Sequence, residues 1–146
     1  MTIVLDAFAV IAALVGEPAA VEVEQQIRRP NADVRISAVN VAEVVDQLLP
    51  QAQLSASAVD SAIDSLVAAG VVIAPVDAAI GRTAGQLRAR HYRKKTAAIS
   101  LADCVALATS LALRATLGTA DPALASVARA LGVDVLALKD SSGRRP

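Results

Sequence analysis

The sequence has few of the residues on which several common kinds of protein depend. Its 146 residues include one cysteine, Cys104, and one histidine, His91, which excludes a disulfide scaffold and a zinc site rich in cysteine or histidine. One Phe, one Tyr and no Trp leave too few aromatic rings for the stacking of exposed bases that single-strand binders use. With 14 basic and 14 acidic side chains the formal net charge is zero, so any site for a polyanion must be local.

The sequence also lacks a long hydrophobic run. The N-terminal stretch MTIVLDAFAVIAALV is interrupted by Asp6 and has no basic leader, and no later stretch approaches the roughly 18 apolar residues that a membrane span requires. The length is that of one domain with a substantial core. We therefore expect a single-domain, soluble, cytoplasmic protein that does not associate with membranes, and the lone cysteine fits a reducing compartment.

Short apolar runs alternate with amphipathic helical patterns, which is typical of a parallel sheet covered by helices on both faces. The sequence predicts an α/β fold, a single three-layer α/β/α domain with a central, mainly parallel sheet of about five short strands. We expect this domain to span residues 1–138 and a flexible C-terminal tail to span 139–146. The expected strands are 2–5, 34–37, 71–74, 115–119 and 133–136, and the expected helices include 7–15, one that begins at 17, one that ends at 49 before Pro50, and 101–113.

Four carboxylates stand where a strand-like run ends or a helix begins: Asp6, Glu43, Asp103 and Asp121. Asp6 and Asp121 directly follow two apolar strands, and doubly wound sheets place their ligand sites beyond that end of the strands. Asp103 and Glu43 lie among apolar neighbours, and no Lys or Arg is close in sequence to any of the four. Because converging carboxylates repel one another while a hard divalent cation needs several carboxylate oxygens, the joint pattern predicts a metal site.

Each of these carboxylates also has a simpler interpretation as a helix cap. Asp6 can cap the helix that follows it, and Asp121 before Pro122 is a good helix start. The segments NVAE, from Asn40 to Glu43, and SLAD, which ends at Asp103, have the spacing of a capping box. Taken one at a time, capping and metal binding both remain open, and only their combination favours the metal site.

Four segments in this order resemble PIN-domain proteins, and specifically the VapC-type toxins of toxin–antitoxin pairs: VLDAFAVIA, SAVNVAEVV, ISLADCVALATSL and LGTADPALASVARALGV. The resemblance covers nearly the whole chain. It implies an endoribonuclease that depends on Mg²⁺ or Mn²⁺, hydrolyses RNA phosphodiesters by metal-activated water, is held inactive by a cognate antitoxin protein and forms a homodimer.

The resemblance also implies roles for individual residues. The metal-site acids of the family fall on the four carboxylates, with Asp6, Asp103 and Asp121 as direct or water-mediated metal ligands and Glu43 as the residue that orients or deprotonates the water. Two supporting polar residues complete the expected site, Asn40 and Thr119. The chain departs from the family at Phe8, where a Ser or Thr is usual, and at Asn40, where Thr is more frequent, so weaker or differently tuned catalysis is possible.

A basic segment free of acids lies between positions 82 and 95. A charge run of this kind is usually a solvated helix face, whereas the functional alternative is a rail for RNA phosphates that leads to the acidic pocket. The candidate RNA-binding residues are Arg82, Arg88, Arg90, Arg93, Lys94 and Lys95. Cys104 is interpreted as a small buried helix residue because nothing near it in sequence would stabilise a thiolate.

Other functions compete with a toxin ribonuclease. A housekeeping PIN nuclease that processes RNA, and a catalytically weak PIN fold that only binds a partner, are both compatible with the sequence. A receiver-like signalling domain expects adjacent acids after its first strand and a lysine after its last, which Asp6-Ala7 and LALKD do not supply. A phosphatase with an Asp-x-Asp motif is disfavoured because Phe8 occupies the second acidic position.

Overall fold

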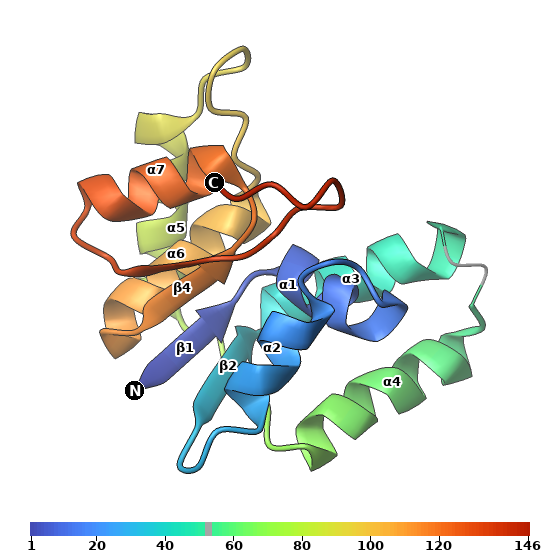
Figure 1. Ribbon diagram of the computed structural model, residues 1–146. Helices are drawn as coiled ribbons and strands as arrows, with labels where there is room; N and C mark the ends of the chain where they lie inside the picture. The colour runs from blue at the N-terminus through green and yellow to red at the C-terminus, as the bar shows by residue number, and fades with distance from the viewer. Residues whose placement is uncertain (52–53) are drawn as a thin grey trace.

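The computed structural model describes residues 1–51 and 54–146, which form a three-layer α/β/α fold around a five-stranded parallel sheet (Figure 1). The strands are β1 (Thr2–Leu5), β2 (Asp33–Ser37), β3 (Val72–Ala74), β4 (Thr116–Thr119) and β5 (Val135–Ala137). The helices are α1 (Ala7–Val15), α2 (Ala20–Ile27), α3 (Ala38–Gln51), α4 (Ala56–Ala68), α5 (Ala78–His91), α6 (Leu101–Leu113) and α7 (Pro122–Ala130). The predicted fold class is confirmed.

The strand order in the sheet is β3-β2-β1-β4-β5, and every pair of neighbours is parallel. The chain builds outward from β1 through β2 to β3 and then crosses back to add β4 on the other side of β1. Leu5, the last residue of β1, pairs with Ile36 on one side and with Gly118 on the other. The strand order therefore reverses between β1 and β4, which is the place where doubly wound sheets hold their ligands.

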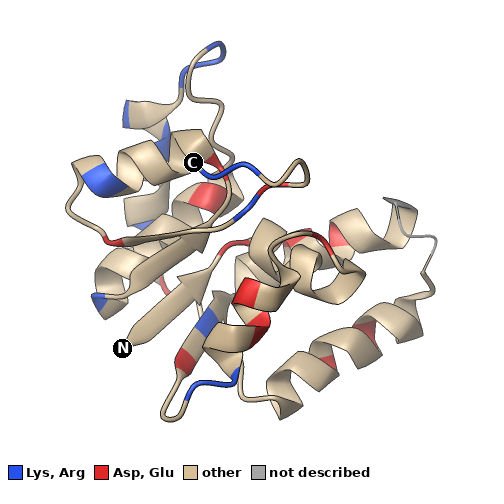
Figure 2. Ribbon diagram, in the orientation of Figure 1, with Lys and Arg blue, Asp and Glu red and all other residues tan. Residues whose placement is uncertain are grey.

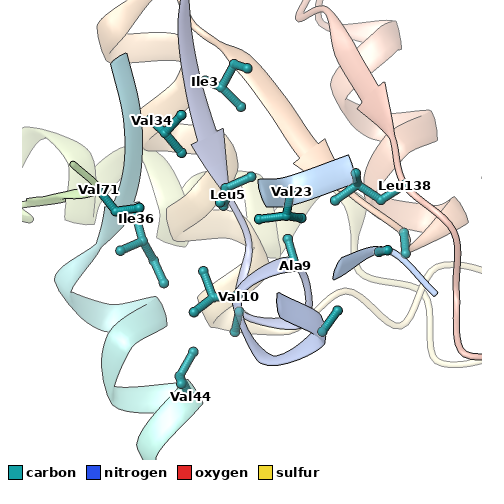
Figure 3. Close-up of a cluster of buried hydrophobic side chains, with 14 of the residues drawn as sticks. Ile3, Leu5, Ala9, Val10, Val23, Val34, Ile36, Val44, Val71 and Leu138 are labelled. Carbon is teal, nitrogen blue, oxygen red and sulfur yellow. The ribbon is translucent and has the colours of Figure 1, made fainter. Parts of the chain in front are cut away.

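Two hydrophobic clusters form the core. The first joins β1 and β2 to α1, α2 and α3, and Figure 3 shows Leu5, Ile36, Val10, Val23 and Val44 within it. The second joins β4 to α5, α6 and α7 and includes fully buried Leu107, Leu117 and Leu124. Burial of both clusters and the direct pairing of β1 with β4 hold the carboxyl ends of these two strands beside each other.

Local signals predicted several element boundaries correctly. Helix α6 spans the expected residues 101–113, and the helix that follows Asp121 has that side chain as its N-cap. The expected end of α3 at residue 49 is wrong, because the helix continues to Gln51 with Pro50 inside it. A proline in the last helical turn removes only one backbone hydrogen bond, and α3 ends one residue later.

The expected start of the second helix at residue 17 is also wrong. Residues 18 and 19 form a turn, and α2 begins at Ala20.

Within the described ranges, none of the helices combines the length and the apolar character needed to cross a membrane.

Candidate active site

The four predicted carboxylates line one cavity of about 470 Å³ beyond the carboxyl ends of β1 and β4. Asp6 and Asp121 follow β1 and β4 directly, Glu43 lies on α3, and Asp103 lies in the first turn of α6. The tertiary structure therefore brings together side chains from both ends of the sequence at the point where the strand order reverses.

Asp6 is the most buried of the four, with 2% of its surface exposed. Its Oδ1 accepts a hydrogen bond of 2.8 Å from the backbone N–H of Ala9, as an N-cap of α1. Burial raises the pKa of Asp6 to about 7, the Thr119 hydroxyl and the Ala9 amide partly offset this rise, and the charges of Asp103 and Glu43 add to it. A buried carboxyl group that is further crowded by two other acids lacks a counter-charge.

The capping interpretation is confirmed for Asp103 and Asp121 as well. The Asp103 Oδ2 accepts a 2.6 Å hydrogen bond from the backbone N–H of Ser100, and the Ser100 Oγ accepts one of 3.0 Å from the Asp103 N–H, so the two residues form a capping box. The Asp121 Oδ1 accepts a 2.8 Å hydrogen bond from the Leu124 N–H. Capping occupies one carboxylate oxygen of each residue and fixes the position of the side chain at the cavity.

The expected capping box from Asn40 to Glu43 is wrong, because Asn40 lies inside α3. Ser37 takes the capping position: its Oγ accepts a 3.0 Å hydrogen bond from the Asn40 N–H, so the helix starts directly after β2. Asn40 is fully buried, and its Nδ2 donates to the Ala102 carbonyl at 3.2 Å and to the Glu43 Oε2 at 3.5 Å. Asn40 therefore links the start of α3 to the start of α6 beneath the cavity.

Glu43 is held on α3 by two amide groups. Gln47 Nε2 donates to its Oε1 at 3.3 Å, in addition to the bond from Asn40. Burial, followed by the charge of Asp103, raises the pKa of Glu43, while the hydrogen bonds from Asn40 and Gln47 partly offset the rise. Gln47 also lines the cavity and was missed by the sequence analysis, although its spacing of four residues from Glu43 on a helix was a usable signal.

Thr119 and Phe8 contribute in different ways. Thr119 is fully buried at the end of β4, and its Oγ1 accepts a 3.0 Å hydrogen bond from the Asp121 N–H. Its hydroxyl also lowers the pKa of Asp6, so Thr119 influences both of the acids that follow strands. Phe8 lines the cavity with an apolar ring.

The chemistry of this set of donors fits a hard divalent cation. Carboxylate oxygens are the preferred protein ligands of Mg²⁺ and Mn²⁺, and a cation would relieve the crowding of like charges around Asp6. Among residues 1–51 and 54–146, no group of three or more His, Cys, Asp or Glu side chains has the arrangement needed to hold a metal ion. The assignment of Asp6, Asp103 and Asp121 as ligands stays a prediction.

The six basic residues predicted to bind RNA lie on α5 and on the loop that follows it, where Figure 2 shows blue segments. In the described part of the chain none of them lines the cavity that holds the carboxylates. The Arg88 guanidinium stacks on the Tyr92 ring with its central carbon 3.7 Å from the ring centroid, so this arginine is partly engaged within its own helix. Their role in RNA binding stays a prediction.

Cys104 is fully buried on α6, next to Asp103. Burial raises the pKa of its thiol to about 11, and the charge of Asp103 contributes to the rise. A thiol with such a pKa is neutral under ordinary conditions and is a poor nucleophile. The structural interpretation of Cys104 is confirmed.

The C-terminal segment supplies cavity residues that the sequence analysis missed. Asp140, Ser141, Ser142 and Arg144 all line the cavity. They belong to the segment predicted to be a flexible tail, and nothing in their local sequence indicates that the chain returns to the carboxylates. The division at residue 138 and the mobility of the segment stay predictions.

Comparison with known proteins places this geometry in a family. The model of the PIN domain family matches residues 3–130, which include all four carboxylates. A comparison with curated proteins gave no match.

Solved structures of similar fold cover nearly the whole chain. VapBC2 from Rickettsia felis, bound to a DNA fragment from its promoter, has a TM-score of 0.67 at 18% identity over 92% of this chain and 97% of that chain. VapC20 from Mycobacterium tuberculosis, a toxin that cleaves the sarcin-ricin loop, has a TM-score of 0.67 at 15% identity over 86% and 94%. DNA-bound VapBC from Salmonella typhimurium has a TM-score of 0.66 at 14% identity over 92% and 96%.

Proposed function

The chain belongs to the PIN-domain family, and on that premise we propose that it is a Mg²⁺- or Mn²⁺-dependent endoribonuclease that acts as the toxin of a toxin–antitoxin pair. The observation that carries the proposal is the cavity at the ends of β1 and β4, where Glu43, Asp103 and Asp121 share one space with the buried Asp6. Four acids that converge without a bound counter-charge repel one another, which lowers the stability of a fold that only binds a partner. The same four acids are appropriate ligands for a cation that activates water.

In the proposed reaction, the three aspartates would bind the cation and Glu43 would accept a proton from the attacking water. One oxygen of each aspartate accepts a backbone hydrogen bond at a helix start, and the other oxygen would be the one that binds the cation. A bound divalent cation supplies Lewis acidity, which lowers the pKa of water and offsets negative charge that develops on the phosphate oxygens.

Glu43 is the residue proposed to orient and deprotonate the attacking water. Its pKa is raised by burial and by Asp103, which moves the basicity of the carboxylate toward neutral pH. The amide groups of Asn40 and Gln47 fix its two oxygens, so the proton acceptor has a defined position. Attack by water on the phosphodiester leaves a 5′-phosphate and a 3′-hydroxyl.

The proposed partners are an RNA substrate, a cognate antitoxin protein and a second copy of the chain. Two of the similar structures are VapBC complexes bound to DNA, and a third is a toxin that cleaves an RNA loop, which supports this assignment by analogy. The same analogy favours a toxin over a housekeeping RNA-processing nuclease. The catalytically weak alternative rests on Phe8, which brings an apolar ring into the cavity.

The proposal is tested by incubating the purified protein with total RNA in Mn²⁺, in Mg²⁺ and in excess chelator. We expect cleavage only with a divalent cation, and products that are digested by an exonuclease specific for 5′-phosphate ends. Asp103→Asn keeps a side-chain oxygen for the capping box but removes the charge, so we expect a loss of activity of at least about 100-fold with the fold retained.

Asp77→Asn is the control for removal of a carboxylate charge at a helix start, because Asp77 is the N-cap of α5 but is exposed and does not line the cavity. This variant should cleave RNA as the wild type does. Cleavage that persists in chelator, or products that end in a cyclic phosphate, would contradict the proposed metal-dependent attack by water.

A further inference from the structure

The C-terminal segment forms a closed turn from Asp140 to Arg144. Asp140 Oδ1 accepts hydrogen bonds from the Ser142 N–H at 2.9 Å, the Ser142 hydroxyl at 2.7 Å and the Arg144 N–H at 2.8 Å. The Asp140 N–H in turn donates to the Arg144 carbonyl at 2.7 Å. These four bonds fix the backbone of Arg144 relative to Asp140, and the turn therefore presents Arg144 from a defined position.

The turn is held against the body of the molecule from both sides. Arg145 donates from Nη1 to the Glu22 Oε2 on α2 at 2.8 Å, and it also donates to the carbonyl of Ala137 at the end of β5. On the other side, Arg129 Nη2 on α7 donates to the Pro146 carbonyl at 3.5 Å. Figure 1 shows the C-terminal end of the chain returning beside α7. This attachment places the turn over the cavity that holds the four carboxylates.

Arg144 is the basic residue of that cavity. Among the described residues that line it, Arg144 is the sole Lys or Arg. Its side chain is 83% exposed, its Nε donates to the Ser142 Oγ at 2.8 Å, and its ion pair with the Asp140 Oδ2 is 3.6 Å long. Within residues 1–51 and 54–146 its guanidinium has no hydrogen bond to any of the four carboxylates, so most of its donors are left for a ligand in the cavity.

We propose that Arg144 is a phosphate-binding residue of the active site, which holds a phosphate group of the RNA at the rim of the carboxylate cavity. This inference rests on the proposed function, because an RNA phosphate is the anion expected there. A phosphodiester that approaches four acids is repelled by them, and the planar guanidinium group of arginine binds phosphate oxygens through two parallel hydrogen bonds. Arg144 would therefore contribute to substrate affinity close to the bond that is cleaved.

The inference is tested with steady-state kinetics on a labelled RNA oligonucleotide that the wild type cleaves. Arg144→Gln should raise KM by about 10-fold or more, because a charge-assisted contact is lost, while kcat falls less. The dependence of log affinity on log salt concentration should become shallower by about one unit. Arg144→Lys should recover part of the affinity because it restores the charge without the planar geometry.

Arg28→Gln is the control for the charge change, since Arg28 is the exposed C-cap residue of α2 and pairs with Glu24 of that helix, away from the cavity. Binding of the same oligonucleotide is also measured in the Asp103→Asn background, which separates affinity from cleavage. We expect melting temperatures of the Arg144 variants to match that of the wild type, because the side chain is largely exposed.

The outcomes separate the inference from the function on which it depends. If the wild type cleaves RNA but Arg144→Gln and Arg28→Gln have the same KM and salt dependence, the role of Arg144 is wrong and the nuclease proposal stands. Faster cleavage by Arg144→Gln would also overturn it, since the arginine would then obstruct the cavity. If the wild type cleaves no RNA with either metal, both proposals are wrong.

Discussion

Single residues at this cavity serve the fold and the site at once. Asp6 and Asp121 are N-caps, Asp103 is the third helical residue of a capping box with Ser100, and these three helix starts lie around one cavity. A capping hydrogen bond contributes about 1 kcal/mol and also restricts the side chain to one orientation. Capping and metal binding are therefore compatible interpretations of each of these aspartates.

Burial of Asp6 predicts a pH-dependent stability of the metal-free protein. Because its pKa is raised to about 7, the native state binds a proton more tightly than the unfolded state, whose Asp pKa is near 3.9. Ionisation of the buried Asp6 destabilises the native state. This cost is absent well below the pKa of the unfolded state and grows as pH rises toward the pKa of the folded state, so the free energy of unfolding falls over that range. Asp6→Asn removes the titration but keeps an oxygen for the Ala9 N–H.

Urea unfolding in chelator at about pH 5 and about pH 8.5 measures this effect. At the higher pH we expect Asp6→Asn to be more stable than the wild type by on the order of 2–4 kcal/mol, with a smaller gain at the lower pH. Asp77→Asn, the same substitution at an exposed N-cap, is the control for loss of a capping carboxylate. An equal gain for Asp6→Asn at both pH values would mean that the buried charge is not its cause.

At the scale of elements, the close approach of β1 and β4 determines where the cavity forms. The Asp6 N–H donates to the Gly118 carbonyl at 3.1 Å, which extends the pairing of the two strands to the first residue of the site. A Cβ atom added at Gly118 would lie 2.8 Å from the Leu5 Cδ2, in a core where Leu5 is fully buried. The absence of a side chain at Gly118 therefore leaves room for the Leu5 side chain where β4 pairs with β1.

This packing predicts opposite effects for two glycine substitutions. Gly118→Ala should destabilise the protein by about 1–3 kcal/mol, because the added methyl group must displace the Leu5 side chain. Gly85→Ala should stabilise it by about 0.5–1 kcal/mol, because Gly85 is in the middle of α5 and an added Cβ meets no atom within 4 Å. Denaturant unfolding of both variants compares them directly, and a neutral Gly118→Ala would show that Leu5 has room to move.

For the whole molecule, zero net charge conceals an uneven distribution. Five acids and one arginine line the cavity, because Asp140 and Arg144 join the four predicted carboxylates, whereas Figure 2 shows other basic residues on the loop after α5. A cation that binds the native cavity but not the unfolded chain stabilises the fold by mass action. A free metal concentration of 100 times the dissociation constant adds about 2.7 kcal/mol to the free energy of unfolding, which corresponds to a rise of several degrees in melting temperature.

Thermal melts with and without Mg²⁺ or Mn²⁺, at ionic strength matched with KCl, test this linkage. The wild type and Asp77→Asn should both melt at a higher temperature with the metal. The double variant Asp6→Asn, Asp121→Asn should not respond, because two of the proposed ligands have lost their charge. An unchanged wild-type melting curve would count against the metal site, and an equal shift in the double variant would move metal binding elsewhere.

Local physics made much of the fold and of the carboxylate set predictable. Alternation of apolar runs with helical periodicity predicted the parallel sheet, because burial on both faces imposes that pattern on the sequence. The placement of acids after strands predicted that Asp6 and Asp121 share an edge. Capping at Asp103 was likewise visible, since a capping box spans only four residues.

By itself, the sequence determined the order of the elements, the sheet class and which acids stand at helix starts, since all of these depend on neighbours close in the chain. Only the tertiary structure decided that Asn40 donates to Ala102, 62 positions away, and that Arg144 reaches the cavity while the basic segment after α5 does not. The physical reason is that such contacts depend on how whole helices and the C-terminal segment pack. The periodicity of apolar residues along the chain does not predict that packing.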